Sequence, residues 1–299
     1  MAETTKHPHY IYRYYLRAWA SNEQIYCLRE RKSLFPANLM KVGQENSFYE
    51  FSVCTDEEIA IGFYHAQNGC ERIMEMYQCI NNELKNVPPE QMRDVKGKAI
   101  IDFAKQCEET HFNCKIEERL QAVLPCLYQK KFNFLEEEAA AMEFFHSIAE
   151  QYCRTKKMKE GTNSSVRELN NPNIRGHNVW LLIRHSLAFK MGLSFFNNKY
   201  QVCLLENVDG DFITSDQPVI NFHADYGRKI PEEVELYYPI SPELALVISK
   251  KVEYPDRTIV RVTRDDVMVW NERMVEASYN QLFSNRKDIL EKYIVSGSK

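Results

Sequence analysis

The sequence predicts an α+β fold, with a helical middle inserted between short N-terminal elements and a C-terminal antiparallel sheet plus closing helix. Apolar residues recur at helical spacing up to Leu193, and short strand-like runs begin at Tyr200. No low-complexity segment or internal repeat interrupts the 299 residues. We therefore expect one domain spanning residues 1–299, with sub-regions at 1–54, 55–193 and 200–299.

The N-terminal sub-region is predicted to begin with a helix over His7–Ala20, because apolar residues recur there every three or four positions. A short strand over Gln24–Arg29 follows, and then a loop-rich stretch to Phe51. The helical region begins at Thr55, whose hydroxyl can cap a helix. Three acidic residues at 56–58 favour the positive end of that helix, which is expected to extend to about Asn86.

The rest of the helical region contains one predicted loop, because Glu160–Asn173 is rich in Gly, Asn, Ser and Pro. Further helices are expected over Glu90–Glu109, Ile116–Gln129, Leu135–Lys159 and Arg175–Leu193.

In the C-terminal sub-region, Asp209-Gly210 is a strong hairpin signal between strand-like runs at Tyr200–Leu205 and Phe212–Thr214. Thr263 is expected to cap the closing helix. Further strands are expected at Val219–Phe222, Glu235–Tyr238, Leu244–Ile248 and Thr258–Val262.

The composition excludes a histone-like nucleic-acid binder, because 38 basic and 42 acidic residues give a net charge of −4. The signatures of P-loop NTPases, dinucleotide-binding folds, α/β-hydrolases and zincins are missing. One cluster of basic residues remains. Such a cluster usually lies at the C-terminus of a helix, where it complements the helix dipole, rather than at a nucleic-acid contact. This cluster comprises Arg154, Lys156, Lys157 and Lys159, with Lys130 and Lys131 nearby.

The nine cysteines are an odd number, and no two are spaced as C-x-x-C. This argues against both a disulfide framework and a zinc ribbon, so we expect reduced thiols. The N-terminus lacks an apolar leader, and no stretch approaches 18 continuous apolar residues. We therefore expect a soluble, cytoplasmic protein without a membrane segment.

Two segments at opposite ends of the chain could carry chemistry. His7 and His9, in HPHYIYRYYLRAWA, could bind a metal or a phosphate, although a solvated aromatic helix is the alternative. Ser215 and Asp216 end an apolar strand before Pro218, where a carboxylate can be functional. There the alternative is a turn in which both side chains satisfy the backbone.

A third candidate is the helix over Arg175–Leu193. His177 and Arg184 fall on one narrow stripe of it, which could line a pocket for an anionic ligand. An exposed polar face is the alternative interpretation. Glu143 and His146 have the E-x-x-H spacing of di-iron bundles, but His146 falls on an apolar stripe, where a core histidine is the default.

The sequence resembles the bacterial family called domain of unknown function 4238. The resemblance rests on motifs spread over nearly the whole chain, and it departs mildly at Ile240, where the family usually has Leu. It brings no established activity, but it implies one site built from both ends of the chain. The matching elements are His9 through Tyr15-Leu16 to Trp19, Phe48-Tyr49, Thr214-Ser215-Asp216-Gln217-Pro218, Pro239-Ile240-Ser241-Pro242 and Asn271.

The leading hypothesis is an enzyme, a metal-dependent nuclease or phosphodiesterase. Imidazole and carboxylate groups together suit a divalent metal ion that generates hydroxide and stabilises phosphate charge. The expected metal ligands are His7, His9 and Asp216. The expected catalytic residues are His9, Asp216 and Ser215, and the expected substrate-binding residues are Arg13, Tyr14, His177, Arg184 and Asn271.

This hypothesis implies nucleic acid as a partner and, by analogy with stand-alone bacterial effectors, a role in phage defence. The alternative is a non-catalytic sensor or a module that binds a ligand or peptide through the same residues. The two interpretations of Asp216 differ in one respect. A metal ligand can be replaced by Ala with little change in stability, whereas loss of a structural turn unfolds the protein.

Overall fold

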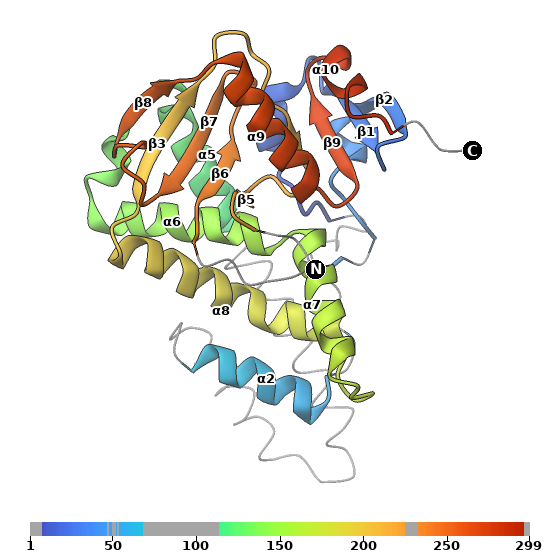
Figure 1. The fold of residues 1–299 in the computed structure, drawn as a ribbon. Coiled ribbons are helices and arrows are strands. Elements are labelled where there is room, and N and C mark those ends of the chain that lie inside the picture. Colours follow the sequence, from blue (N-terminus) through green and yellow to red (C-terminus); the bar gives the residue numbers. More distant parts are fainter. Residues whose placement is uncertain are drawn as a thin grey trace.

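The computed structural model describes residues 8–46, 48, 49, 52, 54–67, 114–224 and 233–295. These residues form helices and two sheets that are antiparallel except for one strand pair, so the predicted α+β class is confirmed (Figure 1). The helix predicted over Glu90–Glu109 lies outside the described residues, as does the stretch from 68 to Asn86. Among the described residues, no helix combines the length and apolar character needed to cross a membrane.

The larger sheet has five strands in the order β5-β6-β7-β3-β8, and only the β3–β8 pair is parallel. All six residues of β7 are buried, because helices cover both faces of this sheet. The bounds are β3 Gln201–Glu206, β5 Ile220–Asn221, β6 Leu236–Pro239, β7 Leu244–Ser249 and β8 Thr258–Arg261.

Side chains of this sheet alternate between two hydrophobic clusters, as the pleat of a strand requires. Leu204 and Leu246 face one cluster, which also holds Phe144 of α6 (Glu138–Cys153). Leu205 and Val247 face the other, which holds residues of α9 (Arg264–Ala277).

The smaller sheet has four strands in the order β2-β1-β9-β4, and it joins the two ends of the chain. The N-terminal strand β1 lies between β2 and the C-terminal strand β9, with Tyr26 opposite Ser284. The bounds are β1 Gln24–Arg29, β2 Ser33–Asn38, β4 Thr214–Ser215 and β9 Gln281–Ser284. Strands β2 and β9 were not predicted.

Helices α6, α8 and α2 form successive layers on one side of the larger sheet (Figure 1). Helix α6 lies between the sheet and α8 (Gly176–Asn197), and α2 (Asp56–Ala66) lies beyond α8. Gly192 permits the close approach of α6 and α8, because a Cβ there would lie 2.7 Å from the Cα of His146. The other helices are α1 Arg13–Leu16, α5 Cys114–Tyr128, α7 Lys156–Glu168 and α10 Lys287–Glu291.

The hairpin predicted at Asp209-Gly210 is wrong. Gly210 does adopt a turn conformation at φ +65°, but the flanking strands β3 and β4 belong to different sheets. β7 pairs with β3 instead, and the amide of Phe212 donates to the carbonyl of Pro242. A turn signal is local, so it does not specify which strand the following segment pairs with.

The loop predicted over Glu160–Asn173 is also wrong, because most of it belongs to α7. The Thr155 hydroxyl accepts from the amide of Met158 and starts this helix. Burial of Val166 favours the helix despite the weak helix propensity of the Gly, Asn and Ser residues in the segment. The helix predicted over Leu135–Lys159 is accordingly broken at residues 154 and 155, between α6 and α7.

The helix predicted over His7–Ala20 is much shorter in the structure. Residues 8–12 are not helical: His9 forms a β-bridge with Gln44, and the Tyr10 amide donates a hydrogen bond to the Gly43 carbonyl. Helical residues begin only at Arg13 and end at Trp19 in a 3₁₀ turn.

This short helical segment connects the two ends of the chain. The Tyr15 hydroxyl donates to the carbonyl of Pro239 at 2.7 Å and is hydrogen-bonded to the Thr214 hydroxyl at 2.6 Å. The Trp19 indole donates to the carbonyl of Phe212 at 2.9 Å. All of these groups are buried, so each bond satisfies a polar group that water does not reach.

We predict that Tyr15→Phe lowers the free energy of unfolding by about 1–3 kcal/mol, since two buried oxygens lose their partner. Tyr14→Phe is the matched control, because Tyr14 lies next to it, is only partly buried and makes no described hydrogen bond through its hydroxyl. Its effect should stay within about 0.5 kcal/mol. Chemical denaturation measures both variants, and equal effects would contradict the role of Tyr15.

Candidate functional site

Asp216 lies in a turn that fastens the start of β9. Its side chain is fully buried. Oδ1 accepts from the Tyr279 amide at 2.7 Å, and Oδ2 accepts from the Asn280 and Gln281 amides at 2.8 and 3.0 Å. Burial raises the pKa of Asp216 to about 6. The three amides have the opposite effect on this pKa, because they stabilise the ionised carboxylate. The carboxylate is therefore engaged by backbone, as the turn interpretation expects.

Ser215 and Asn271 make contacts of the same kind. The Ser215 hydroxyl donates to the carbonyl of Gln217 and accepts from its amide, both at 3.0 Å. Asn271 accepts from the Ile213 amide and donates to the Asp211 carbonyl. The contacts around Asp216, Ser215 and Asn271 thus hold loops in place and lend no support to their predicted catalytic, metal-binding and substrate-binding roles.

A second cluster surrounds Arg154, which is 2% exposed at the end of α6. Its Nε donates to the Tyr49 hydroxyl at 3.1 Å, and its Nη2 donates to the carbonyl of His9 at 3.0 Å. Its guanidinium carbon lies 4.0 Å from the centre of the Tyr12 ring. Burial lowers the pKa of Arg154 to about 9, which leaves the group charged at neutral pH.

Arg184 of α8 and Arg154 both lie against the ring of Tyr49. The guanidinium carbon of Arg184 is 4.5 Å from the centre of the Tyr49 ring and 5.1 Å from that of Trp180. The side chain is 1% exposed, so the exposed polar face considered for this helix is wrong at Arg184. Burial lowers its pKa to about 10, and contact with Tyr49 opposes that shift.

Several buried polar atoms around Arg154 lack a hydrogen-bond partner within the described part of the chain. They are Nη1 of Arg154, the hydroxyl of Tyr12 and both amide atoms of Gln151. Gln151 lies one turn before Arg154 on α6. Each such group costs about 1–3 kcal/mol, so their concentration in one place calls for a functional explanation.

Glu150 supplies the negative charge of this region. Its Oε1 lies 2.7 Å from Nδ1 of His185 and 3.5 Å from Nε2 of His146. Burial by itself would raise the pKa of Glu150, but the two histidines lower it to about 2. Burial lowers the pKa of His185, and Glu150 opposes that shift. Glu150 is therefore ionised at neutral pH and is hydrogen-bonded to the buried His185 ring.

The structure brings together some of the predicted site residues. His9 and Arg184 lie in the cluster around Arg154, and burial, then the charges of Arg13 and Arg154, lower the pKa of His9. Arg13 itself pairs with Glu23 at 3.3 Å.

The remaining predicted residues lie elsewhere or are not described. Tyr14 is partly buried against the core, and the His177 ring centre lies 6.3 Å from that of Trp180. Asp216 connects to the cluster only indirectly, because Gln281 donates from its side chain to the hydroxyl of Tyr10. His7 lies outside the described residues.

Arg154 was not predicted as a site residue, because in the sequence it belongs to a run of basic residues. The structure divides that run. Lys156 and Lys159 pair with Glu45, and Lys157 donates to the carbonyls of Glu276 and Ser278. The only signal that could have separated Arg154 from its neighbours is its i, i+4 spacing from Glu150 on a largely apolar helix.

No group of three or more His, Cys, Asp or Glu side chains within the described ranges could hold a metal ion. The thiols of Cys27, Cys54, Cys126, Cys153 and Cys203 are free. The reduced state expected for the other cysteines stays a prediction.

A comparison with protein-family models matches residues 7–288 to the family described as "Protein of unknown function (DUF4238)". The chain belongs to this family. The resemblance inferred from the motifs is therefore confirmed, and the structure links those motifs, since Tyr15 bonds both Thr214 and Pro239. The comparisons find no matching curated protein and no matching solved structure.

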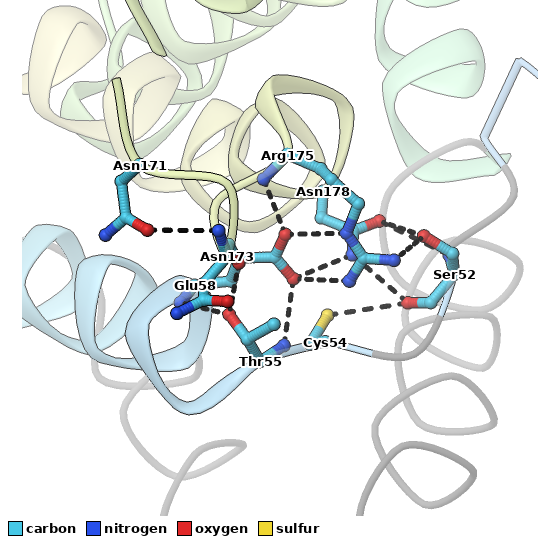
Figure 2. Close-up of polar contacts among 8 residues, drawn as sticks. All are labelled: Ser52, Cys54, Thr55, Glu58, Asn171, Asn173, Arg175 and Asn178. Carbon is cyan, nitrogen blue, oxygen red and sulfur yellow. Dashed lines mark hydrogen bonds and ion pairs between the residues drawn. The ribbon is translucent and has the colours of Figure 1, made fainter. Parts of the chain in front are cut away.

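This DUF4238 chain also contains a polar network around Glu58, where α2 meets the start of α8 (Figure 2). The buried carboxylate accepts from the Thr55 amide, from the amide and guanidinium of Arg175, and from the Asn178 side chain, at 2.7–2.9 Å. Ser52 donates to the Asn178 side chain. Because Glu58 has a full set of donors, the network is a structural joint between the two helices.

A surface pocket of about 540 Å³ opens beside this joint, between α7, the following loop and the first turn of α8. Arg167 and His177 contribute to its lining. His177 therefore lies at the surface end of the α8 face that carries Trp180 and Arg184, three and seven residues further along.

We predict that Asp216→Ala lowers the free energy of unfolding by about 3–5 kcal/mol, because three amides lose a buried, charged acceptor. The exposed Asp209→Ala is the control and should change stability by less than about 0.5 kcal/mol. Thermal or urea unfolding measures both. An Asp216→Ala protein as stable as wild type would restore the metal-ligand interpretation.

Proposed function

We propose that this protein binds a ligand carrying a phosphate group, with Arg154 as the principal contact. The proposal rests on the buried Nη1 of Arg154, which has no hydrogen-bond partner among the residues that the structure describes. Within the described part of the chain, no carboxylate pairs with this guanidinium either. A buried cation in that situation costs several kcal/mol, and a bound anion offsets this cost.

The surroundings favour a phosphate group in particular. Guanidinium donors match the geometry of phosphate oxygens, and a charge-assisted bond of this kind is about twice as strong as a neutral one. The ring of Tyr12 lies under the guanidinium, and its hydroxyl is a further donor that has no partner within the described ranges. The charge of Arg184, on the shared Tyr49 ring, adds positive potential.

Binding is the part of the predicted function that these contacts support, which favours the ligand-binding module over the nuclease. A metal-dependent nuclease or phosphodiesterase also needs a phosphate site, but no described group beside Arg154 has contacts that assign it an acid or base role. The nuclease activity, the divalent metal ion, the nucleic-acid partner, the phage-defence role and the cytoplasmic location stay predictions.

Thermal unfolding with inorganic phosphate, against chloride at equal ionic strength, tests the proposal. At 100 times the dissociation constant, phosphate should stabilise wild type by about 2.7 kcal/mol. In a chain of this size that raises the melting temperature by roughly 4 °C. Arg154→Met should abolish the shift, and Arg154→Lys should reduce it, because lysine keeps the charge without the fork of donors.

Arg261→Met is the matched control, since Arg261 is 85% exposed, and it should retain the full shift. Without phosphate, Arg154→Met should be within about 1 kcal/mol of wild type, because removing an uncompensated buried charge offsets the lost contacts. A phosphate shift that persists in Arg154→Met, or that is missing from wild type, would contradict the proposed function.

A further inference from the structure

Two buried arginines lie against Tyr49, and their charges bear on which phosphate compounds the site accepts. The guanidinium carbon of Arg184 lies 4.5 Å from the centre of the Tyr49 ring, and that of Arg154 lies 5.7 Å from it, so the two carbons are at most about 10 Å apart. Both side chains are at most 2% exposed. Salt and water therefore screen the two charges less than they would at the surface.

Tyr49 gives the two arginines a neutral contact rather than a compensating charge. Its hydroxyl accepts from Nε of Arg154 at 3.1 Å. Burial raises the pKa of Tyr49, and the charge and hydrogen bonding of Arg184 oppose that shift without reversing it. The hydroxyl is therefore protonated at neutral pH, and two positive charges share one uncharged group.

Two carboxylates also act on Tyr49, but each has a smaller effect on its pKa than Arg184 has. They are Glu150 of α6 and Glu117 of α5. Glu150 is hydrogen-bonded to His185 at 2.7 Å, and no hydrogen bond or ion pair within the described residues joins either carboxylate to Arg154. The surroundings of Tyr49 are therefore positive where the two arginines meet.

We propose that Arg154 and Arg184 together make the site selective for a doubly charged phosphate monoester over a singly charged phosphodiester, an inference that rests on the proposed function. A monoester offers three acceptor oxygens to the donors of the site, whereas a diester offers two non-bridging oxygens. Both guanidinium groups also attract the second negative charge of the monoester. At about 10 Å and an effective dielectric constant near 20, the attraction between one pair of charges changes affinity by more than roughly tenfold.

This selectivity defines the class of ligand. A monoester has its phosphate at one end of the molecule, as in a mononucleotide or a sugar phosphate. The internal linkages of a nucleic acid are diesters, so the site discriminates against them.

The test compares monomethyl phosphate with dimethyl phosphate on the full-length protein by calorimetric titration at pH 7.5 and constant ionic strength. At this pH the monoester carries two negative charges, because its second pKa is about 6, and the diester carries one. We expect wild type to bind the monoester more tightly, by more than roughly tenfold. Arg184→Gln removes the charge and keeps a polar side chain beside Tyr49, and it should reduce this preference by roughly tenfold.

Arg184→Met removes the same charge with an apolar side chain and should have the same effect, so one folded variant of the two is enough. Arg261→Met is the matched control, since Arg261 is 85% exposed, and it should keep the wild-type preference. Wild type that binds the diester as tightly as the monoester would overturn the inference whether or not the variants fold. A preference that the loss of the Arg184 charge leaves unchanged would also overturn it. If neither ester nor inorganic phosphate binds wild type, the proposed function itself fails.

Discussion

The guanidinium of Arg154 lies at the break between α6 and α7, where an aromatic ring, a phenol oxygen and a backbone carbonyl hold it out of water. These contacts come from the extended N-terminal segment and from Tyr49, so the arginine fixes the path of both against the helices. A cation buried in this way destabilises the folded state unless an opposite charge accompanies it. The nearest anion on α6, Glu150, is held by histidines instead.

The two ends of the chain meet close to this centre, which explains how distant motifs can serve one structure. β1 pairs with β9, and Tyr15 connects the N-terminal motif to Thr214 and Pro239. Asp216 accepts a hydrogen bond from the amide of Gln281, the first residue of β9. The Gln281 side chain in turn donates to the hydroxyl of Tyr10, which is next to His9 in the sequence. The strand-end motif therefore supports the segment that bears His9, and the described contacts of its carboxylate are with backbone amides.

Features that depend on local chemistry could be predicted from the sequence. Thr55 and Thr263 both form the capping boxes that their acidic followers indicate, and the strands around Leu244 and Thr258 follow from apolar runs bounded by turn residues. Pairing between distant segments could not be predicted from local sequence. The prediction of a hairpin at Gly210 was therefore wrong, and β9 was not predicted. The burial of a charge is also invisible in sequence: Arg154 and the neighbouring lysines look alike, yet Arg154 is 2% exposed without a carboxylate partner among the described residues, whereas Lys156 and Lys159 pair with Glu45.

A crystal structure of the protein grown with phosphate tests most directly whether Arg154 is built to hold an anion. We expect a phosphate oxygen at about 2.7–2.9 Å from Nη1 of Arg154, with the guanidinium still on the Tyr12 ring and hydrogen-bonded to Tyr49. Phosphate bound only at exposed lysines, with Nη1 of Arg154 paired to a carboxylate of the chain, would contradict it.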